Sequence, residues 1–277
     1  MVMVLALLSS AILGSADFVG GMAARRARAT VVVVWSNAAG LLSAIAIVGL
    51  LPGRFAPADV GWGLLAGLCG TAGAVLLYRA LAVGVMSVLA PTTAAASALL
   101  PGVAGLLRGE EVTATAGVGI AAALGAMVLI SRRTQSAVSD GGTRGMGSAL
   151  LAGVSFGGFL VALAHTGAEA AGWPLVFARC ASLPVLLMVV VVSRVPLRLP
   201  AGSAGLALLS GALDMMSNLL FLLAIRSGHL ALTGLLASLS PVGTIGLARI
   251  LLKERLRAPQ QIGAALAMCS VLLLAVG

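Results

Sequence analysis

Long, nearly uninterrupted apolar segments dominate this sequence and restrict the folds that it can adopt. A helix needs about 20 apolar residues to cross the roughly 30 Å of hydrocarbon in a bilayer. Ten segments of about that length follow one another along the 277 residues. They are residues 3–22, 30–51, 60–79, 85–107, 112–131, 147–165, 172–192, 203–224, 229–251 and 259–276. The sequence therefore predicts an all-α integral membrane protein with about ten transmembrane helices.

The scarcity of charged residues argues against a soluble protein. Charged residues make up 9% of the chain and apolar residues 60%, whereas a soluble domain carries roughly 25% charged residues. The net charge of +9 does not indicate a nucleic-acid partner, because the arginines fall in short clusters between apolar segments and form no basic face with interleaved aromatics. We expect a multi-pass protein of a cell membrane, plasma or inner, with the lipid bilayer as its surroundings.

The two halves of the sequence resemble each other. A shift of 144 residues places Gly67 over Gly211, and the order of several short motifs is preserved. Residues 132–146, which combine Gly, Ser, Thr, Asp and Arg, have the composition of a linker. We therefore predict one five-helix repeat at 1–131 and a second at 147–277. An odd number of spans in each half inverts the second half in the membrane, which is typical of secondary transporters.

Basic residues between the segments predict the orientation of the chain. The odd-numbered links, counted from the N-terminus, hold Arg25, Arg26, Arg28, Arg132, Arg133, Arg144, Arg194, Arg198, Lys253, Arg255 and Arg257, and the even-numbered links hold only Arg54, Arg108 and Arg226. This distribution predicts that the odd links are cytoplasmic and that both termini lie outside.

Several motifs resemble the EamA-type transporters of the drug/metabolite transporter superfamily. The matching segments are GSADFVGGMAARRA, LLYRALAVGVMSVLAPTTA, GALDMMSNLLFLLAIRSG and, as the closest match, LASLSPVGTIGLARILLKERL from Leu236 to Leu256. The resemblance implies ten helices in two inverted five-helix repeats, a central substrate cavity, and export or uptake of small metabolites. It also implies that both termini are cytoplasmic, which is the reverse of the prediction from the loop charges.

Two carboxylates fall within predicted spans, where a charge costs about 2.5–3.5 kcal/mol on insertion scales. Asp17 resembles the membrane-embedded acidic residue in the first helix of small multidrug resistance proteins, and this implies that it binds protons and cationic substrate in turn. The alternative for Asp17 is a polar anchor near a helix end. Asp214 and Asn218 are four residues apart and share one helix face. Arg179 is the candidate partner of Asp214, and the alternative to a cavity role is a structural pair that holds two helices together.

Other polar and aromatic residues are candidates for the substrate site. Asn37 either contacts substrate or hydrogen-bonds a neighbouring helix. Phe18, Phe156 and Tyr78 are candidates for the cavity wall, with helix packing as the alternative. Ser155 joins them, because the segment that begins with Asp17-Phe18 aligns with the one that begins with Ser155-Phe156.

Proline and glycine positions suggest where helices bend or approach one another. Pro91 and Pro241 lie in the fourth predicted helix of each half. Because proline removes a backbone donor and tends to kink a helix, the two are candidate gate elements, and the alternative is an ordinary membrane proline. Gly63 and Gly67 have the small-xxx-small spacing that permits close helix packing in lipid.

The sequence predicts no enzyme, no cofactor and no metal site. Cys69, Cys180 and Cys269 have no metal-ligand spacing, and the chain has no phosphate-binding glycine loop followed by Lys-Ser/Thr. The leading prediction is a secondary transporter, in particular an exporter, of small metabolites or lipophilic compounds. It would work by alternating access, with proton coupling through Asp17 or Asp214 as one option. The alternatives are a lipid or lipid-carrier flippase and a non-transporting scaffold or accessory subunit, and no oligomeric state follows from the sequence.

Overall fold

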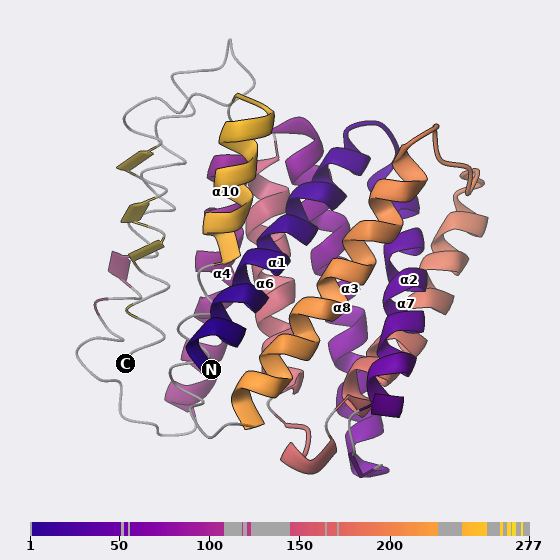
Figure 1. Cartoon of the computed structure of the whole chain (residues 1–277), viewed down its shortest axis with the longest axis vertical. Helices are drawn as coiled ribbons and strands as arrows, with labels where there is room; N and C mark the ends of the chain where they lie inside the picture. Colours follow the sequence, from indigo (N-terminus) through magenta and orange to yellow (C-terminus); the bar gives the residue numbers. More distant parts are fainter. Residues whose placement is uncertain are drawn as a thin grey trace.

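A computed structural model describes residues 2–50, 53–54, 56–107, 145–163, 165–170, 172–226 and 240–253, with a few single positions at 118–122 and 261–273. The helices are α1 (Val2–Ala24), α2 (Ala29–Leu50), α3 (Ala58–Val83), α4 (Met86–Leu107), α6 (Met146–Leu163), α7 (Trp173–Val192), α8 (Ser203–Arg226), α10 (Ser240–Leu251) and the short 3-10 helix η2 (Ala168–Ala170). They form a bundle with the helix axes roughly along one direction (Figure 1).

The prediction of an all-α membrane protein is confirmed. Within the described residues, six helices are long and apolar enough to cross a membrane, namely α1, α2, α3, α6, α7 and α8. Most of the predicted spans 112–131 and 259–276, and nearly all of the linker 132–146, lie outside the described residues. The count of ten helices therefore stays a prediction.

Large apolar side chains lie on the outside of the bundle. Leu42, Val191 and Ile250 are each more than 70% exposed, a placement that suits lipid as the surrounding solvent. The buried positions hold many small residues, such as Ala66, Ala80 and Ser210. Since lipid offers no hydrophobic drive for helix association, small residues let the helix backbones approach closely and gain packing contacts.

Two glycines mark the closest of these approaches. A Cβ atom on Gly67 of α3 would lie 2.1 Å from the carbonyl oxygen of Ala178 in α7. A Cβ atom on Gly211 of α8 would lie 2.0 Å from the carbonyl oxygen of Ser36 in α2. The close packing predicted at Gly67 is thus confirmed, and Gly211 makes the matching contact in the second half.

The most extensive helix contacts join one half of the chain to the other. α1 packs on α8 as α6 packs on α3, and α2 packs on α8 as α7 packs on α3. α4 likewise contacts α6, and α10 contacts α1. The two halves are therefore interleaved, and neither half forms a bundle of its own within the described residues.

The first helices of the two halves run in opposite directions. Arg25, directly after α1, donates hydrogen bonds to the carbonyl oxygens of Leu81 and Gly84, each at 3.2 Å, at the end of α3. Gly145, directly before α6, also meets the end of α3, because a Cβ atom there would lie 2.9 Å from Ala80 Cα. The end of α1 and the start of α6 therefore lie at the same end of the bundle (Figure 1).

Basic residues gather at this end. We call it the basic end, defined by Arg25, Arg26, Arg28, Arg79, Arg194, Arg198 and Lys253, which lie at or near helix ends there. Trp35 of α2 ties the segment after α7 to this end, since its Nε1 donates to Leu197 O at 3.0 Å. The main apolar core also lies here, because it includes Ala23, Met86 and Met146, each next to a helix end. Apolar packing therefore holds the helices together at the basic end of the described bundle.

Candidate functional site

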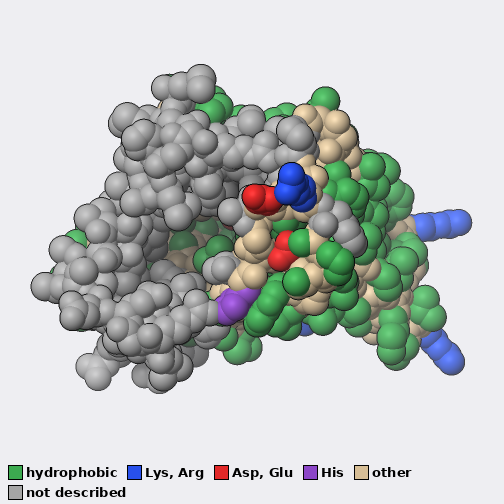
Figure 2. All heavy atoms as spheres, turned by 90° about the horizontal axis from the view of Figure 1, so that it is seen from below, with side chains coloured by type: hydrophobic (Ala, Val, Ile, Leu, Met, Phe, Trp, Pro, Cys, Tyr) green, Lys and Arg blue, Asp and Glu red, His purple; other side chains and the backbone are tan. Residues whose placement is uncertain are grey.

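A cavity of about 270 Å³ lies between the helices, and each described α-helix contributes to its wall. Val33, Leu77 and Tyr78 belong both to the cavity wall and to the apolar core. The core therefore separates the cavity from the basic end. Figure 2 shows the opposite end, where acidic, basic and histidine side chains gather and the surface is hollowed.

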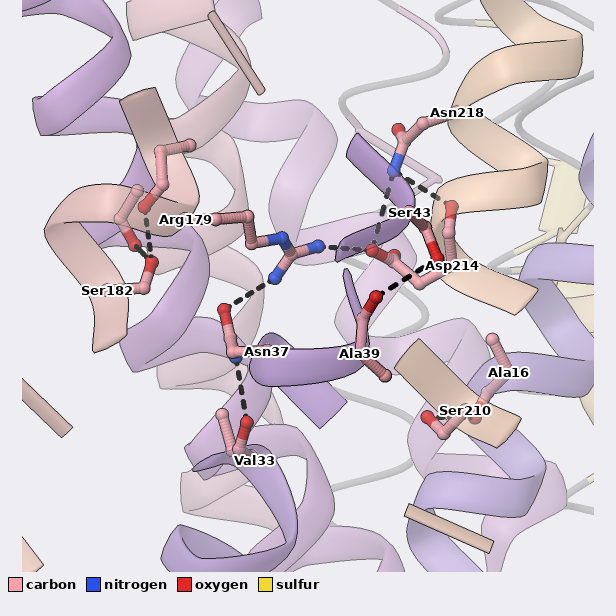
Figure 3. Close-up of polar contacts among 12 residues, drawn as sticks. Ala16, Val33, Asn37, Ala39, Ser43, Arg179, Ser182, Ser210, Asp214 and Asn218 are labelled. Carbon is pink, nitrogen blue, oxygen red and sulfur yellow. Dashed lines mark hydrogen bonds and ion pairs between the residues drawn. The ribbon is translucent and has the colours of Figure 1, made fainter. Parts of the chain in front are cut away.

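Arg179 of α7 is the centre of a polar network on the cavity wall (Figure 3). Its Nη1 donates to Asn37 Oδ1 on α2 at 2.6 Å, and its Nη2 forms an ion pair with Asp214 Oδ2 on α8. Asn218 Nδ2, one turn along α8, donates to the backbone oxygen of Asp214 at 2.9 Å and to its carboxylate at 3.4 Å. The predicted pairing of Asp214 with Arg179 is confirmed, and the network joins helices from both halves.

Two residues of α2, Asn37 and Gly40, form the surface against which the Arg179 guanidinium lies. Asn37 is 2% exposed, and its Nδ2 donates to Val33 O at 2.9 Å in the same helix, which leaves Oδ1 to accept from Arg179. Gly40, nearly one turn further along, has no side chain, and a Cβ atom there would lie 3.2 Å from Arg179 Nε. The absent side chain lets the arginine lie flat against α2.

Asp17 of α1 lines the same cavity, but its surroundings differ from those of Asp214. Within the described part of the chain, no side chain or backbone group donates a hydrogen bond to it, and no cation pairs with it. Nearby, Ser210 Oγ donates to Ala16 O at 3.0 Å, so Tyr78 must donate the 2.6 Å bond between the two hydroxyl groups. Of the two carboxylates on the described cavity wall, Asp214 is paired with Arg179 and Asp17 has no described countercharge.

The remaining wall is largely apolar. Phe156 of α6 lines the cavity and packs where α3 has no side chain, since a Cβ atom on Gly73 would lie 2.8 Å from its ring. Phe159, Leu160 and Leu175 continue this surface. A ligand here would meet charged and amide groups on one side and hydrocarbon on the other, which is the usual design of a small-molecule site.

Three predicted residues do not reach the cavity. Phe18 is 4% exposed and packs in the apolar core, so of its two predicted roles the structure supports helix packing and not the cavity wall. Ser155 is turned toward its own helix, where its hydroxyl donates to Leu151 O at 2.9 Å. Pro91 is fully buried in α4, whereas Pro241 of α10 does line the cavity. A gate role for these prolines stays a prediction.

The sequence reasoning missed Asp59, a buried carboxylate outside the cavity. It lies in the first turn of α3, is 5% exposed, and accepts a hydrogen bond from Gly167 N at 2.9 Å through Oδ1. Its Oδ2 has no hydrogen-bond partner among the described residues. An acidic residue soon after a proline at a helix start is ordinary, so the sequence carries no signal for its contact with the segment before η2.

The hydroxyl groups of the wall were also missed. Thr71, Thr93 and Ser182 line the cavity, and Ser182 Oγ donates to both Ala178 O at 2.6 Å and Gly67 O at 3.0 Å. A serine or threonine that bonds backbone oxygens fits an apolar helix without any pattern in the sequence. Within the described residues, no group of three His, Cys, Asp or Glu side chains could hold a metal ion.

Comparison with known proteins agrees with this architecture. Nine chains of solved structures match the chain, and one of them, described only as "Crystal structure of protein", has a TM-score of 0.61 and 15% identity over 98% of this chain and 96% of its own. At that identity the likeness concerns the fold alone. No curated protein matches the chain.

A family model gives the identification. Residues 143–276 match the model of the EamA-like transporter family, whose members are membrane transporters and not enzymes. The match covers the second half of the chain, which supplies Phe156, Arg179 and Asp214 to the polar cavity. Residues 143–276 of the chain are thus an EamA-like transporter family domain, of the drug/metabolite transporter superfamily.

Proposed function

We propose that this protein is a secondary transporter, in particular an exporter, of small molecules, which works by alternating access around the central cavity. The observation that carries the proposal is the charged network of Arg179, Asp214 and Asn37 on the cavity wall, built by helices of both halves. Ionisable groups at membrane depth are costly and usually mark a substrate or ion pathway.

The helix arrangement supports two inverted five-helix repeats, at 1–131 and 147–277, joined by the linker 132–146. α1 and α6 run in opposite directions, and the contacts of the two halves occur in matched pairs. Inverted repeats of this kind place the substrate site near the bilayer midplane at the repeat interface. The cavity lies between helices of the first half, α1–α4, and helices of the second half, α6–α10, as expected for a site at the interface of two repeats.

The position of the cavity supports a proposal about the side of the membrane to which it is closed. The apolar core separates it from the basic end, and an excess of Lys and Arg is typical of cytoplasmic loops. We therefore propose that the structure is closed to the cytoplasm, with both termini outside, in the plasma or inner membrane. The family resemblance implies cytoplasmic termini, and tags at the two ends would distinguish the two orientations.

Cavity size favours a small metabolite over a lipid. A volume of about 270 Å³ is near the lower end of the range of about 300–1,000 Å³ that is typical of pockets for small molecules. The wall combines Asn37, Arg179 and Asp214 with Phe156 and Leu160. It suits a compact molecule that has polar groups and an apolar body.

Transport by purified protein in proteoliposomes tests the proposal. Substrates would first be selected by the rise that they cause in the unfolding temperature of the purified protein, and then followed across the bilayer with and without a pH gradient. We expect Asp17→Asn to abolish gradient-driven transport and to leave the folded protein intact. The matched variant Asp59→Asn, at a buried carboxylate outside the cavity, should retain transport.

Two outcomes would favour the alternatives. Movement of a fluorescent phospholipid across the bilayer, in the absence of metabolite transport, would indicate a flippase. If no compound is transported and Asp17→Asn has no effect on any ligand's binding, a scaffold or accessory subunit is the better description.

A further inference from the structure

A second pocket, of about 400 Å³, lies at the basic end and is separate from the central cavity. It is formed where α2 begins, α3 approaches its end and α7 ends, and α7 packs against both of the other helices. Its lining consists of Arg28, Ala29, Thr30, Arg79, Val189, Val190, Ser193 and Val195. The proposed transport function uses none of these residues.

The pocket has an unbalanced positive charge. Arg28 and Arg79 are both exposed, and no described carboxylate pairs with either of them. Asp17 and Asp214 line the central cavity, and Asp59 and Glu169 lie at the opposite end. The two guanidinium groups therefore face the pocket without a described countercharge.

The position of Arg79 indicates the depth of the pocket in the membrane. It lies within the apolar span of α3, four residues before the helix ends, and its side chain is on the outer surface. Arginine at that depth is tolerated when its long side chain reaches the polar headgroup layer. Its charge is therefore available at the level where lipid phosphates lie.

The backbone adds hydrogen-bond donors to the pocket wall and leaves few free hydrogen-bond acceptors there. Ala29 and Thr30 begin α2, and the first amides of a helix have no partner within it. At the end of α7 the carbonyl oxygens of Val189 and Val190 already accept bonds from Ser193 N at 3.0 Å and Val195 N at 3.1 Å. The pocket therefore offers an anion two guanidinium groups, the hydroxyls of Thr30 and Ser193, and the start of a helix.

An apolar track leads along α7 to this pocket. Val185, Met188, Val189 and Val192 are 42%, 68%, 45% and 73% exposed, and their spacing of three and four residues places them on one face of the helix. Val189 belongs both to the track and to the pocket wall. A free phosphate has no apolar group that could contact this surface, whereas the acyl chain of a lipid would pack along it.

We propose that the pocket between α2, α3 and α7 binds an anionic phospholipid, with the headgroup phosphate between Arg28 and Arg79 and an acyl chain along α7. Basic pockets between transmembrane helices are known to suit such headgroups. The site would lie in the leaflet next to the basic end, outside the substrate pathway. Its occupant would brace the ends of three helices that also form the cavity wall.

Native mass spectrometry of the purified full chain tests the proposal, with phosphatidylglycerol and phosphatidylcholine added in separate samples. The intact protein should retain phosphatidylglycerol in preference to phosphatidylcholine. The double variant Arg28→Gln/Arg79→Gln should lower phosphatidylglycerol retention by about tenfold or more, since it removes both charge-assisted contacts. The control Arg26→Gln/Arg194→Gln removes two charges from the same end but outside the pocket, and it should retain the lipid.

Four results would overturn the proposal. Equal losses in the pocket and control variants would indicate a general attraction to the basic end, and full retention by the pocket variant would exclude the site. Displacement of phosphatidylglycerol by millimolar glycerol phosphate would indicate a water-soluble anion. If the double variant does not fold, Val189→Glu, which leaves both arginines in place, should also lower retention, and unchanged retention would then exclude the site.

Discussion

Arg179 carries a charge in the cavity wall because two neighbouring helices supply acceptors for it. Asn37 satisfies one side of the guanidinium and Asp214 neutralises the other. The side chains of Arg179 and Asp214 are 21% and 29% exposed, so both reach the cavity space. In the proposed transporter, stability and substrate binding would therefore depend on the same atoms at this site.

Removal of Arg179 should therefore cost more than removal of the whole pair. Arg179→Gln leaves Asp214 uncompensated, and we expect a loss of about 1–3 kcal/mol in unfolding free energy, less than for a fully buried pair because of the cavity. The double variant Arg179→Gln/Asp214→Asn should recover part of that loss. Unfolding temperatures of the purified variants at one pH would measure both effects.

The control for this pair is the exposed pair at the opposite end. The side chains of Arg54 and Glu169 are 88% and 79% exposed, and their closest charged atoms are 3.8 Å apart. Arg54→Gln should therefore change the unfolding temperature little, because solvent screens such pairs. If the double variant at Arg179 and Asp214 is no more stable than Arg179→Gln alone, the pair does not carry the coupling that its geometry suggests.

Asp59 gives a second prediction at this scale. Asp59→Ala removes the acceptor for Gly167 N and a negative charge from the start of α3, and we expect a loss of about 1 kcal/mol. The segment before η2 should also open more often, so limited proteolysis near residues 165–170 should become faster. The control Glu169→Gln changes an exposed side chain in the same segment and should leave the cleavage rate unchanged.

At the scale of helices, the apolar segments of the sequence were sufficient to locate most elements. The predicted span 30–51 is α2 at Ala29–Leu50, and 172–192 is α7 at Trp173–Val192. Both results follow from the requirement that a chain in lipid satisfies its backbone groups within each helix. In α10, the described helix covers only the later part of the predicted span 229–251.

Helix faces were much harder to predict. Phe18 and Phe156 align in the repeat, yet Phe18 lies in the core and Phe156 lines the cavity. In a soluble helix, polar residues mark the outer face, but here lipid-facing and protein-facing sides are both apolar. Asp17, Arg179 and Asp214 could be identified because each is a polar exception, whereas Leu160 could not.

The glycine contacts of α3 and α8 should control helix association. Gly67→Ala and Gly211→Ala each place a methyl group about 2 Å from a backbone oxygen of the facing helix, so the helices must separate. We expect a loss of about 1–3 kcal/mol for each variant, as for overpacked cores. Unfolding temperatures would show this loss.

The same helices provide matched controls. Gly61 of α3 and Gly205 of α8 have nothing within 4 Å of an added Cβ atom. Gly61→Ala and Gly205→Ala should therefore leave stability unchanged or raise it slightly, since alanine is the better helix former. Similar losses at all four glycines would mean that the helix backbone, and not the close approach, sets the effect.

At the scale of the whole molecule, the interleaving of the two halves links any gating movement to the contacts between them. α3 of the first half packs along α6 of the second, and both contribute to the cavity wall. If the halves rock against each other to expose the cavity alternately, this contact must change. A covalent bond across it should then stop transport.

The chain offers such a bond with one substitution. A Cβ atom on Gly158 of α6 would lie 3.7 Å from the Cβ atom of Cys69 on α3, close to the distance of about 3.8 Å that is typical of disulfides. We expect Gly158→Cys to form a disulfide with Cys69 under oxidation, to lose transport in proteoliposomes, and to regain it after reduction. Gly147→Cys, in the same helix with open space around its Cβ position, should transport equally well in both redox states. A fully oxidised Gly158→Cys protein that still transports would show that the α3–α6 contact stays fixed through the cycle, and the movement would then have to lie between other helices.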